Sequence, residues 1–153
     1  MRLALFQPDI PQNTGTLLRL GACLGVPVDI IEPCGFIFDD QRLRRSAMDY
    51  LEHVDMTRHS SWPEFLARHG GARLVLLSAH AAHAYTDFTF HADDILVLGQ
   101  ESAGVPEMVR ARADAALHIP LAAGLRSLNV AVAAAMVLGE AMRQTQAFPR
   151  GPT

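Results

Sequence analysis

The sequence has no lysine, and all 13 of its lysine-or-arginine positions are arginine. Aspartate and glutamate together number 16, so the formal net charge at pH 7 is -3. This balance excludes a protein that binds nucleic acid through bulk positive charge, and any such binding would need a local cluster of arginines. Arginine suits that role, because its planar guanidinium can donate two parallel hydrogen bonds to one phosphate.

Cysteines and long apolar segments are also scarce. The two cysteines, Cys23 and Cys34, lack the spacing of a metal site, and we expect two small buried thiols in a reducing compartment. The N-terminus lacks the apolar region of a signal peptide, and the apolar run after Leu128 is far shorter than the ~20 residues that span a membrane. We therefore expect a cytoplasmic protein with no membrane-spanning segment.

Common ligand-binding motifs are absent as well. The sequence has no P-loop and no G-x-G-x-x-G after a predicted strand, which excludes the usual nucleotide-binding fingerprints. His80 and His83 have a spacing that a metal site could use, but no third ligand is evident beside them. We therefore expect no metal.

Hydrophobic residues make up 50% of the 153 residues, which is enough for one domain with a substantial core. Short apolar runs alternate with helical patterns, and this predicts an α/β fold with a mainly parallel sheet flanked by helices. The runs expected to form strands are Leu3–Phe6, Val28–Ile31, Leu74–Leu77, Ile95–Leu98 and Ala116–Ile119. We expect a single domain over residues 1–147 and a flexible tail over residues 148–153.

Helix-start signals lie between these runs. Asn13 is predicted to cap a helix that ends at Gly25. Asp39 and Asp40 are predicted to begin a short helix that continues through Arg45, because acidic residues favour the first turn of a helix and basic residues the last. These signals support the alternation of strands and helices.

The longest apolar segment lies within residues 119–143, after the last predicted strand. Gly124 allows the backbone to bend there, and Ser127 and Asn129 are side chains that commonly cap helices. The helix expected after Leu128 is apolar on nearly all sides, so we expect it to be buried on most of its faces. Its small residues imply close packing against this chain or a second copy.

Three loops carry polar residues that the packing of a core does not require. They are Asn13–Gly15 with Arg19 downstream, Gly99–Gly104, and Gly124–Asn129. In open α/β sheets, ligands bind beyond the carboxyl ends of the strands. The second and third loops are therefore predicted to form the walls of a polar pocket lined by glycine.

Together these loops resemble the motifs of the SPOUT methyltransferases, a family of knotted α/β proteins that use S-adenosylmethionine. The matching sequences are NTG-x-x-x-R at 13–19, LGQESAGVP at 98–106 and IPL…RSLN at 119–129. The sequence of residues 30–50 is similar to the subgroup that methylates the ribose 2'-hydroxyl at the wobble position of tRNA. At Gln100 the chain departs from the family, which usually has proline there.

The resemblance implies a deep C-terminal trefoil knot in which S-adenosylmethionine binds, largely through backbone groups. The residues that it assigns to the cofactor are Leu77, Gly99, Ile119, Ser127 and Leu128. The apolar members of this set suit an adenine ring. Gly99 would let the backbone approach the ligand closely.

The resemblance also implies which residues act in the reaction. Arg19 is the catalytic candidate, and because a guanidinium with a pKa above ~12 is a poor base, we expect it to hold a phosphate and to stabilise the forming alkoxide. Asn13 would position Arg19 or the ribose, and Glu101 would orient Arg19 or Asn13. The identity of the proton acceptor is left open.

For the substrate, the resemblance implies that one predicted helix contacts the anticodon stem-loop of tRNA through Arg42, Arg44 and Arg45. We also expect a homodimer, because a single small domain without an added RNA-binding module offers little surface to tRNA. Two alternatives stay open. One is a SPOUT enzyme that methylates the ribose of another RNA, and the other is a catalytically silent RNA-binding dimer.

Overall fold

The computed structural model describes residues 1–39 and 41–151, and seven strands in this part of the chain form one sheet. Every pairing is parallel, and the strand order is β3-β2-β1-β6-β4-β7-β5. The strands are β1 (Arg2–Phe6), β2 (Val28–Ile31), β3 (Met56–His59), β4 (Leu74–Leu77), β5 (His83–Ala84), β6 (Ile95–Leu98) and β7 (Ala115–His118). The predicted α/β fold with a mainly parallel sheet is confirmed.

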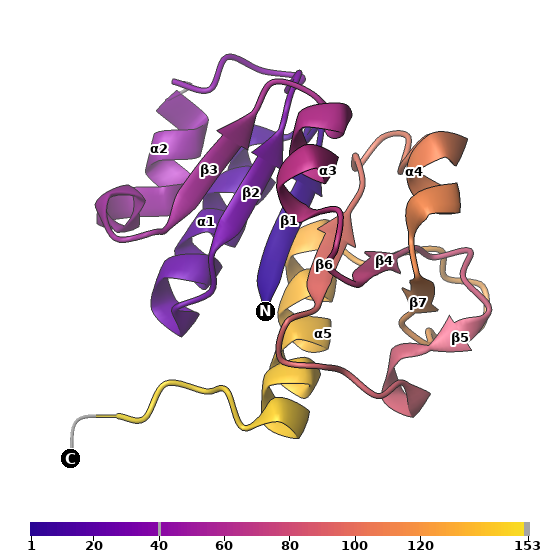
Figure 1. Ribbon diagram of the computed structural model, residues 1–153. Helices are drawn as coiled ribbons and strands as arrows, with labels where there is room; N and C mark the ends of the chain where they lie inside the picture. The colour runs from indigo at the N-terminus through magenta and orange to yellow at the C-terminus, as the bar shows by residue number, and fades with distance from the viewer. Residues whose placement is uncertain (40, 152–153) are drawn as a thin grey trace.

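Helices cover both faces of the sheet (Figure 1). The first face carries α1 (Pro11–Leu24), α2 (Gln41–Ala47) and α5 (Val130–Thr145), and the second carries α3 (Trp62–His69) and α4 (Glu107–Arg112). Two 3-10 helices, η1 (Met48–Glu52) and η2 (Tyr85–Asp87), follow α2 and β5. This arrangement buries β1, β2, β4 and β6 on both sides, which explains their nearly continuous apolar sequences.

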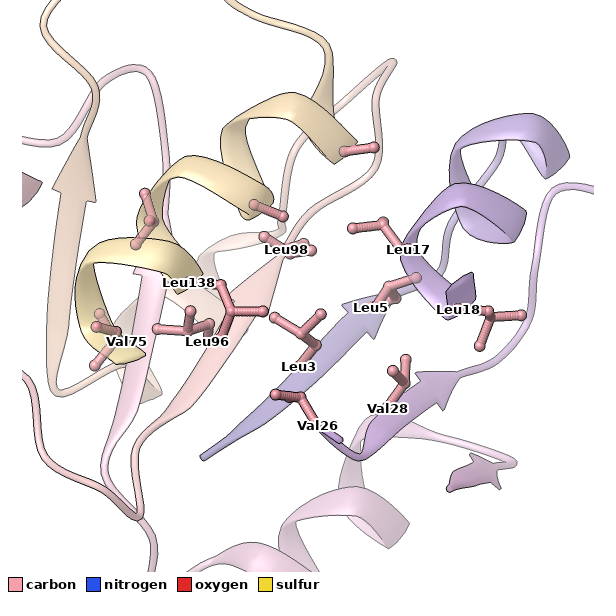
Figure 2. Packing of buried hydrophobic residues seen from close by; sticks show 14 of the residues in the cluster. Leu3, Leu5, Leu17, Leu18, Val26, Val28, Val75, Leu96, Leu98 and Leu138 are labelled. Carbon is pink, nitrogen blue, oxygen red and sulfur yellow. The ribbon is translucent and has the colours of Figure 1, made fainter. Parts of the chain in front are cut away.

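Alternate residues of the central strands β1, β4 and β6 contribute to two separate hydrophobic cores. On the first face, Leu3 and Leu5 of β1 belong to the same cluster as Leu17 of α1 and Leu138 of α5 (Figure 2). On the second face, Phe6 of β1 packs edge-on against Trp62 of α3, with the ring centroids 5.9 Å apart. The first core holds α1 and α5 over the strands, and the second holds α3 and α4 on the other face.

Two side chains of α1 lie differently from prediction. The helix begins at Pro11 with Ile10 as its N-cap, so the prediction that Asn13 caps it was wrong. Proline fits the first helical position because its φ suits a helix and the missing N–H would have no helical partner there. The side chain of Asn13 is therefore available for contacts outside the helix. Cys23 is exposed, not buried as predicted.

The helix α5 is less buried than predicted. One of its faces packs into the core, but Val132 is 50% exposed and Met136 is 40% exposed. Its N-terminus agrees with prediction, since Asn129 is the N-cap and accepts hydrogen bonds from two backbone N–H groups. An apolar face of α5 is therefore left without a partner in a single described chain.

Some expectations about the chain ends stay predictions. These are the trefoil knot and the domain boundary at residue 147. Residues 148–151 form no helix or strand, and residues 152–153 lie outside the described part. Asp40, which was expected to begin a helix together with Asp39, also lies outside the described part; the helix α2 starts at Gln41. None of the helices found in the described ranges has the length and apolar character needed to cross a membrane.

The buried carboxylate of Asp29, on β2, is surrounded by basic side chains. Arg2 Nε donates to Oδ2 at 2.7 Å, and the Nε2 atoms of His59 and His69 lie 2.8 and 3.3 Å from Oδ1. Burial raises the pKa of Asp29, but the hydrogen bonds from Arg2 and His59 outweigh it, so the pKa lies below its ordinary value of 3.8. The ionised form of Asp29 therefore stabilises the fold.

We expect Asp29→Asn to lower the free energy of unfolding at pH 7 by ~3 kcal/mol, the low end for a broken buried ion pair, because Arg2 keeps some contact with water. Since folding lowers the pKa of Asp29, its contribution is present above pH ~4 and is lost as the pH falls through the folded pKa. Urea titrations should therefore show a smaller difference in the free energy of unfolding between wild type and variant at pH 3 than at pH 7. A difference of equal size at both pH values would contradict this account.

Candidate active site

The strands β1, β6, β4 and β7 are neighbours, so the loops that follow them meet at one edge of the sheet. These loops surround a cavity of ≈ 860 Å³, within the range of about 300–1,000 Å³ that is usual for ligand pockets. The structure brings all five residues assigned to the cofactor together in its lining: Leu77, Gly99, Ile119, Ser127 and Leu128. The cavity thus lies where the sequence predicted a pocket.

Sequence analysis missed several polar residues of this lining. Ser78 and His80 follow β4, His118 ends β7, and Arg110 and Arg126 come from α4 and the loop before α5. The Nδ1 atom of His118 is buried and has no hydrogen-bond partner within the described part of the chain.

The Gly99–Gly104 loop is held together by its own backbone. Gln100 N–H donates to the Gly104 carbonyl at 2.8 Å, and Gly104 N–H donates back at 2.9 Å. Proline at position 100 could not donate the first bond, so the departure from the family's usual residue adds a hydrogen bond here. Gly104 has a φ of 66°, a conformation that glycine adopts without steric cost.

A chain of hydrogen bonds links α5, α1 and this loop. Asn129 Oδ1 accepts from the N–H groups of Ala131 and Val132 at 2.9 and 3.3 Å. Its Nδ2 therefore donates to Asn13 Oδ1, at 2.9 Å, and Asn13 Nδ2 donates to Glu101 Oε1, at 3.2 Å. Because the helix cap fixes the orientation of Asn129, it also fixes that of Asn13 and requires Glu101 to accept.

Asp9, in the loop after β1, holds Glu101 from the other side. Its N–H donates to Glu101 Oε2 at 3.3 Å, and Glu101 N–H donates to Asp9 Oδ1 at 3.1 Å. The Ser102 hydroxyl donates to the other carboxylate oxygen of Asp9. Sequence analysis did not single out Asp9, although an acidic residue between Pro8 and Pro11 in a loop after a strand was a usable signal.

The two carboxyl groups of Asp9 and Glu101 perturb each other. Burial raises the pKa of Glu101, and the neighbouring Asp9 carboxyl raises it further. The interaction with Glu101 lowers the pKa of Asp9. Of the two carboxyl groups, Glu101 therefore has the higher affinity for a proton.

Arg19 lies apart from the cavity, on an exposed side of α1 that faces η1. Its Nη1 is 3.2 Å from Met48 Sδ, and its Cζ lies 5.0 Å from the centroid of the Tyr50 ring. Glu101 was expected to orient Arg19 or Asn13, and the structure places Asn13 in contact with Glu101. Arg19 is instead positioned by the segment that follows α2.

The three arginines predicted to contact RNA are exposed on α2: Arg42, Arg44 and Arg45. Arg44 forms an ion pair with Asp39. The buried side of α2 packs closely on α1 at Gly15, where an added Cβ would lie only 2.6 Å from the Leu43 carbonyl oxygen. The helix α2 therefore lies beside the helix that carries Arg19, with its arginines on the exposed side.

An apolar groove lies between α1 and α5. Its lining residues are Asn13, Thr16, Asn129, Ala131, Val132, Ala135 and Met136. Asn13 and Asn129 line the cavity as well, so the groove and the cavity meet at these two side chains.

Two groups of described side chains have potential metal-ligating atoms close together: Asp29 with His59 and His69, and His91 with Asp93 and Asp94. None of these residues lines the cavity. In each group, the buried carboxylate already pairs with an arginine. The absence of a metal stays a prediction.

Comparison with known proteins identifies the family. Residues 1–139 match the family model described as the SpoU rRNA Methylase family. The chain belongs to this family. The resemblance to the SPOUT methyltransferases, drawn from three loops of the sequence, is thereby confirmed.

Curated relatives of this SpoU methylase match along nearly its whole length. The tRNA (cytidine(34)-2'-O)-methyltransferase of Beijerinckia indica subsp. indica is 61% identical over 150 residues, which cover 97% of this chain and 94% of the relative. The protein of the same name from Escherichia coli (strain K12) is 36% identical over 146 residues, covering 94% and 93%.

Solved structures agree with these relatives. One, described as structural insights into the 2-OH methylation of C/U34 on tRNA, has a TM-score of 0.89 at 42% identity and covers 94% of each chain. The SpoU methyltransferase AviRb from Streptomyces viridochromogenes, in complex with the cofactor AdoMet, has a TM-score of 0.84 at 28% identity. That match covers 94% of this SpoU methylase and 60% of the AviRb chain.

Gly99 allows a test of the prediction that the Gly99–Gly104 loop binds the cofactor. An added Cβ would lie 2.6 Å from the Gly104 carbonyl carbon and 2.9 Å from its Cα, so a side chain there must displace the loop itself. We expect Gly99→Ala to weaken S-adenosylmethionine binding by about tenfold or more, that is by about 1.4 kcal/mol, in calorimetry. The matched control is Gly71→Ala, where the added Cβ meets nothing within 4 Å. Equal affinities of the two variants would place the cofactor elsewhere.

Proposed function

We propose that this SpoU methylase transfers a methyl group from S-adenosylmethionine to the ribose 2'-hydroxyl of the wobble nucleotide of tRNA. Relatives at 61% and 36% identity are named for this activity on cytidine 34. The observation that carries the proposal is the hydrogen-bonded chain of Asn129, Asn13 and Glu101 at the edge of the cavity. It puts fixed polar groups next to a space that suits a nucleoside.

The residues of the cavity fit S-adenosylmethionine, which supplies an electrophilic methyl group when bound. Leu77, Ile119 and Leu128 provide apolar surface for an adenine ring. The backbone of the Gly99–Gly104 loop provides polar groups for its edges. The SpoU methyltransferase AviRb, with a similar fold, was solved with this cofactor.

Since the methyl donor is already reactive, the protein must chiefly align the hydroxyl and help to remove its proton. Asn13 positions the ribose, because its amide is fixed from both ends by Asn129 and Glu101. Arg19 holds a phosphate beside the reacting ribose and stabilises the forming alkoxide. Its exposed position on α1 leaves it accessible to an RNA backbone.

The RNA surface continues from Arg19 onto α2. Arg42, Arg44 and Arg45 are exposed there and offer charge-assisted hydrogen bonds to phosphates of the anticodon stem-loop. Local clustering of arginine thus provides an anion-binding surface despite the net charge of -3. The enzyme acts on tRNA in the cytoplasm.

The enzyme works as a homodimer, with the groove between α1 and α5 as the interface. Four large apolar side chains at or beside this groove are 39–50% exposed: Ile10, Leu128, Val132 and Met136. Exposed apolar surface of this kind is typical of subunit interfaces. Because the groove meets the cavity at Asn13 and Asn129, a second copy would stand next to the reacting ribose.

We expect Met136→Arg to raise the dimer dissociation constant by about 100-fold or more, because it places an unpaired charge in an apolar interface. Light scattering at micromolar concentration should give a dimer for wild type and a monomer for the variant. Met108→Arg, at a position 55% exposed on α4, serves as the control and should remain dimeric. A wild-type monomer would refute the interface.

The proposed function is tested by incubating the purified protein with S-adenosylmethionine and unmodified tRNA, and by locating the methyl group with mass spectrometry after nuclease digestion. We expect a 2'-O-methyl group at the wobble nucleotide. A methyl group at another ribose would transfer the assignment to a different RNA position, and methylation of a base would overturn the reaction type. Cofactor binding without any methylation would favour a silent RNA-binding dimer.

A further inference from the structure

Methylation of a hydroxyl oxygen releases a proton, which a positioned side chain has to accept. Within the described ranges, Glu101 carries the one carboxyl group in the lining of the cavity. The other titratable or charged side chains along the lining are His80, Arg110, His118 and Arg126. The arginines stay protonated and cannot accept a proton. Neither histidine takes part in the hydrogen-bonded chain that orients Asn13.

Glu101 keeps room for a proton in spite of its hydrogen bonds. Oε1 accepts one bond from Asn13, and Oε2 accepts one from the Asp9 backbone. Each carboxylate oxygen has two lone pairs, so one site on each oxygen is left for a substrate hydroxyl. The Asp9 carboxylate, in turn, fixes the Glu101 backbone N–H at 3.1 Å and accepts from the exposed Ser102 hydroxyl.

On the basis of the proposed function, we infer that Glu101 accepts the 2'-hydroxyl proton and that Asp9 is a positioning residue that holds Glu101. The ribose O–H bond breaks and its proton moves to a Glu101 carboxylate oxygen. The ribose oxygen uses its electron pair to bond the methyl carbon, and the electrons of the broken carbon–sulfur bond stay on sulfur. The proton then leaves to solvent.

The charges around Glu101 suit this role. Its pKa is raised by burial and by the Asp9 carboxyl, and a base works best when its pKa is brought closer to the operating pH. Asn13 donates a hydrogen bond to the Glu101 carboxylate, so Asn13 both positions the ribose and orients Glu101 toward that ribose. Asp9 acts through Glu101, because its own pKa is lowered and it is a weaker acceptor.

The first test needs no catalysis. In protein labelled with ¹³C at the glutamate carboxyl carbons, we expect NMR titration to give Glu101 a pKa above the ordinary glutamate value. Asp9→Asn keeps the shape of the side chain and an acceptor for the Glu101 N–H, but removes the charge, so it should shift the Glu101 titration to lower pH. Glu107→Gln, which removes an exposed charge from the start of α4, should leave it in place. An unshifted Glu101 titration in Asp9→Asn would overturn the role of Asp9.

The second test measures single-turnover methylation against pH. The acidic limb of the wild-type profile should follow the Glu101 titration and should move to lower pH in Asp9→Asn. Glu101→Gln should lose about 100-fold or more in rate, together with the acidic limb, while its cofactor affinity stays within about threefold. An acidic limb that persists in Glu101→Gln would overturn the proton acceptor. Absence of methylation by wild type would overturn the proposed function and this assignment together, whereas the NMR titration would still decide how Asp9 acts on Glu101.

Discussion

Arg19→Ala is expected to lower the rate of tRNA methylation by about 10³-fold, the upper range for removing one donor that stabilises a developing anion. The forming alkoxide and the neighbouring phosphate both carry negative charge, and Arg19 is the exposed cation on the helix that also presents Asn13. Because Arg19 does not belong to the described lining of the cavity, S-adenosylmethionine affinity should stay within about twofold of wild type. Calorimetry and single-turnover assays separate the two effects.

Arg19→Lys distinguishes the shape of the guanidinium from its charge. Arg19 contacts Met48 and the Tyr50 ring, which hold the flat guanidinium in one orientation. A lysine ammonium keeps the charge but cannot present two parallel donors to a phosphate, so we expect a loss of about 10²-fold or more. Arg68→Ala, an exposed arginine of α3 on the opposite face of the sheet, is the control and should methylate normally. Near-normal activity of Arg19→Ala would remove Arg19 from the mechanism.

The sequence predicted those strands that are buried on both faces, because such strands are continuous runs of apolar residues. The strands containing Leu3, Val28, Leu74 and Ile95 were predicted because helices cover both of their faces, so nearly all of their residues are apolar, and the one buried carboxylate among them, Asp29, is paired with Arg2. The positions of the loops followed from the same reasoning, since parallel strands place their carboxyl ends at one edge. The cavity was predictable for this reason, and the resemblance added a prediction of which ligand it binds.

Elements that depend on distant contacts were not predictable. Strand β3 is short and mostly polar, and it forms because Met56 pairs with Val28 along the sheet edge. Strand β5 has two residues and is defined by pairing with β7. The contact between Asn13 and Asn129 joins residues 116 positions apart, so local pattern could only suggest a cap for each. Asp9 escaped notice for the same reason, since its partner Glu101 lies 92 positions away.

Asn129 combines two roles that one substitution can separate. Its Oδ1 caps α5, and its Nδ2 orients Asn13. Asn129→Asp keeps an oxygen for the cap, and aspartate is as good an N-cap as asparagine with a favourable charge at the start of a helix. Stability should therefore stay within about 0.5 kcal/mol of wild type. Asn129→Ala loses the cap as well and should cost about 1 kcal/mol.

Although Asn129→Asp should leave the stability of the fold nearly unchanged, it should lower the methylation rate strongly. The new carboxylate cannot donate to Asn13, so the Asn13 amide must turn round and direct its oxygen at Glu101, where two acceptors repel each other. The ribose then loses its positioned partner, and we expect the methylation rate to fall by about 10²-fold, the cost of a misplacement of about 1 Å. Thermal unfolding and single-turnover assays on the same preparations measure both roles. If Asn129→Asp and Asn129→Ala lost activity only in proportion to their loss of stability, Asn129 would be a helix cap and nothing more.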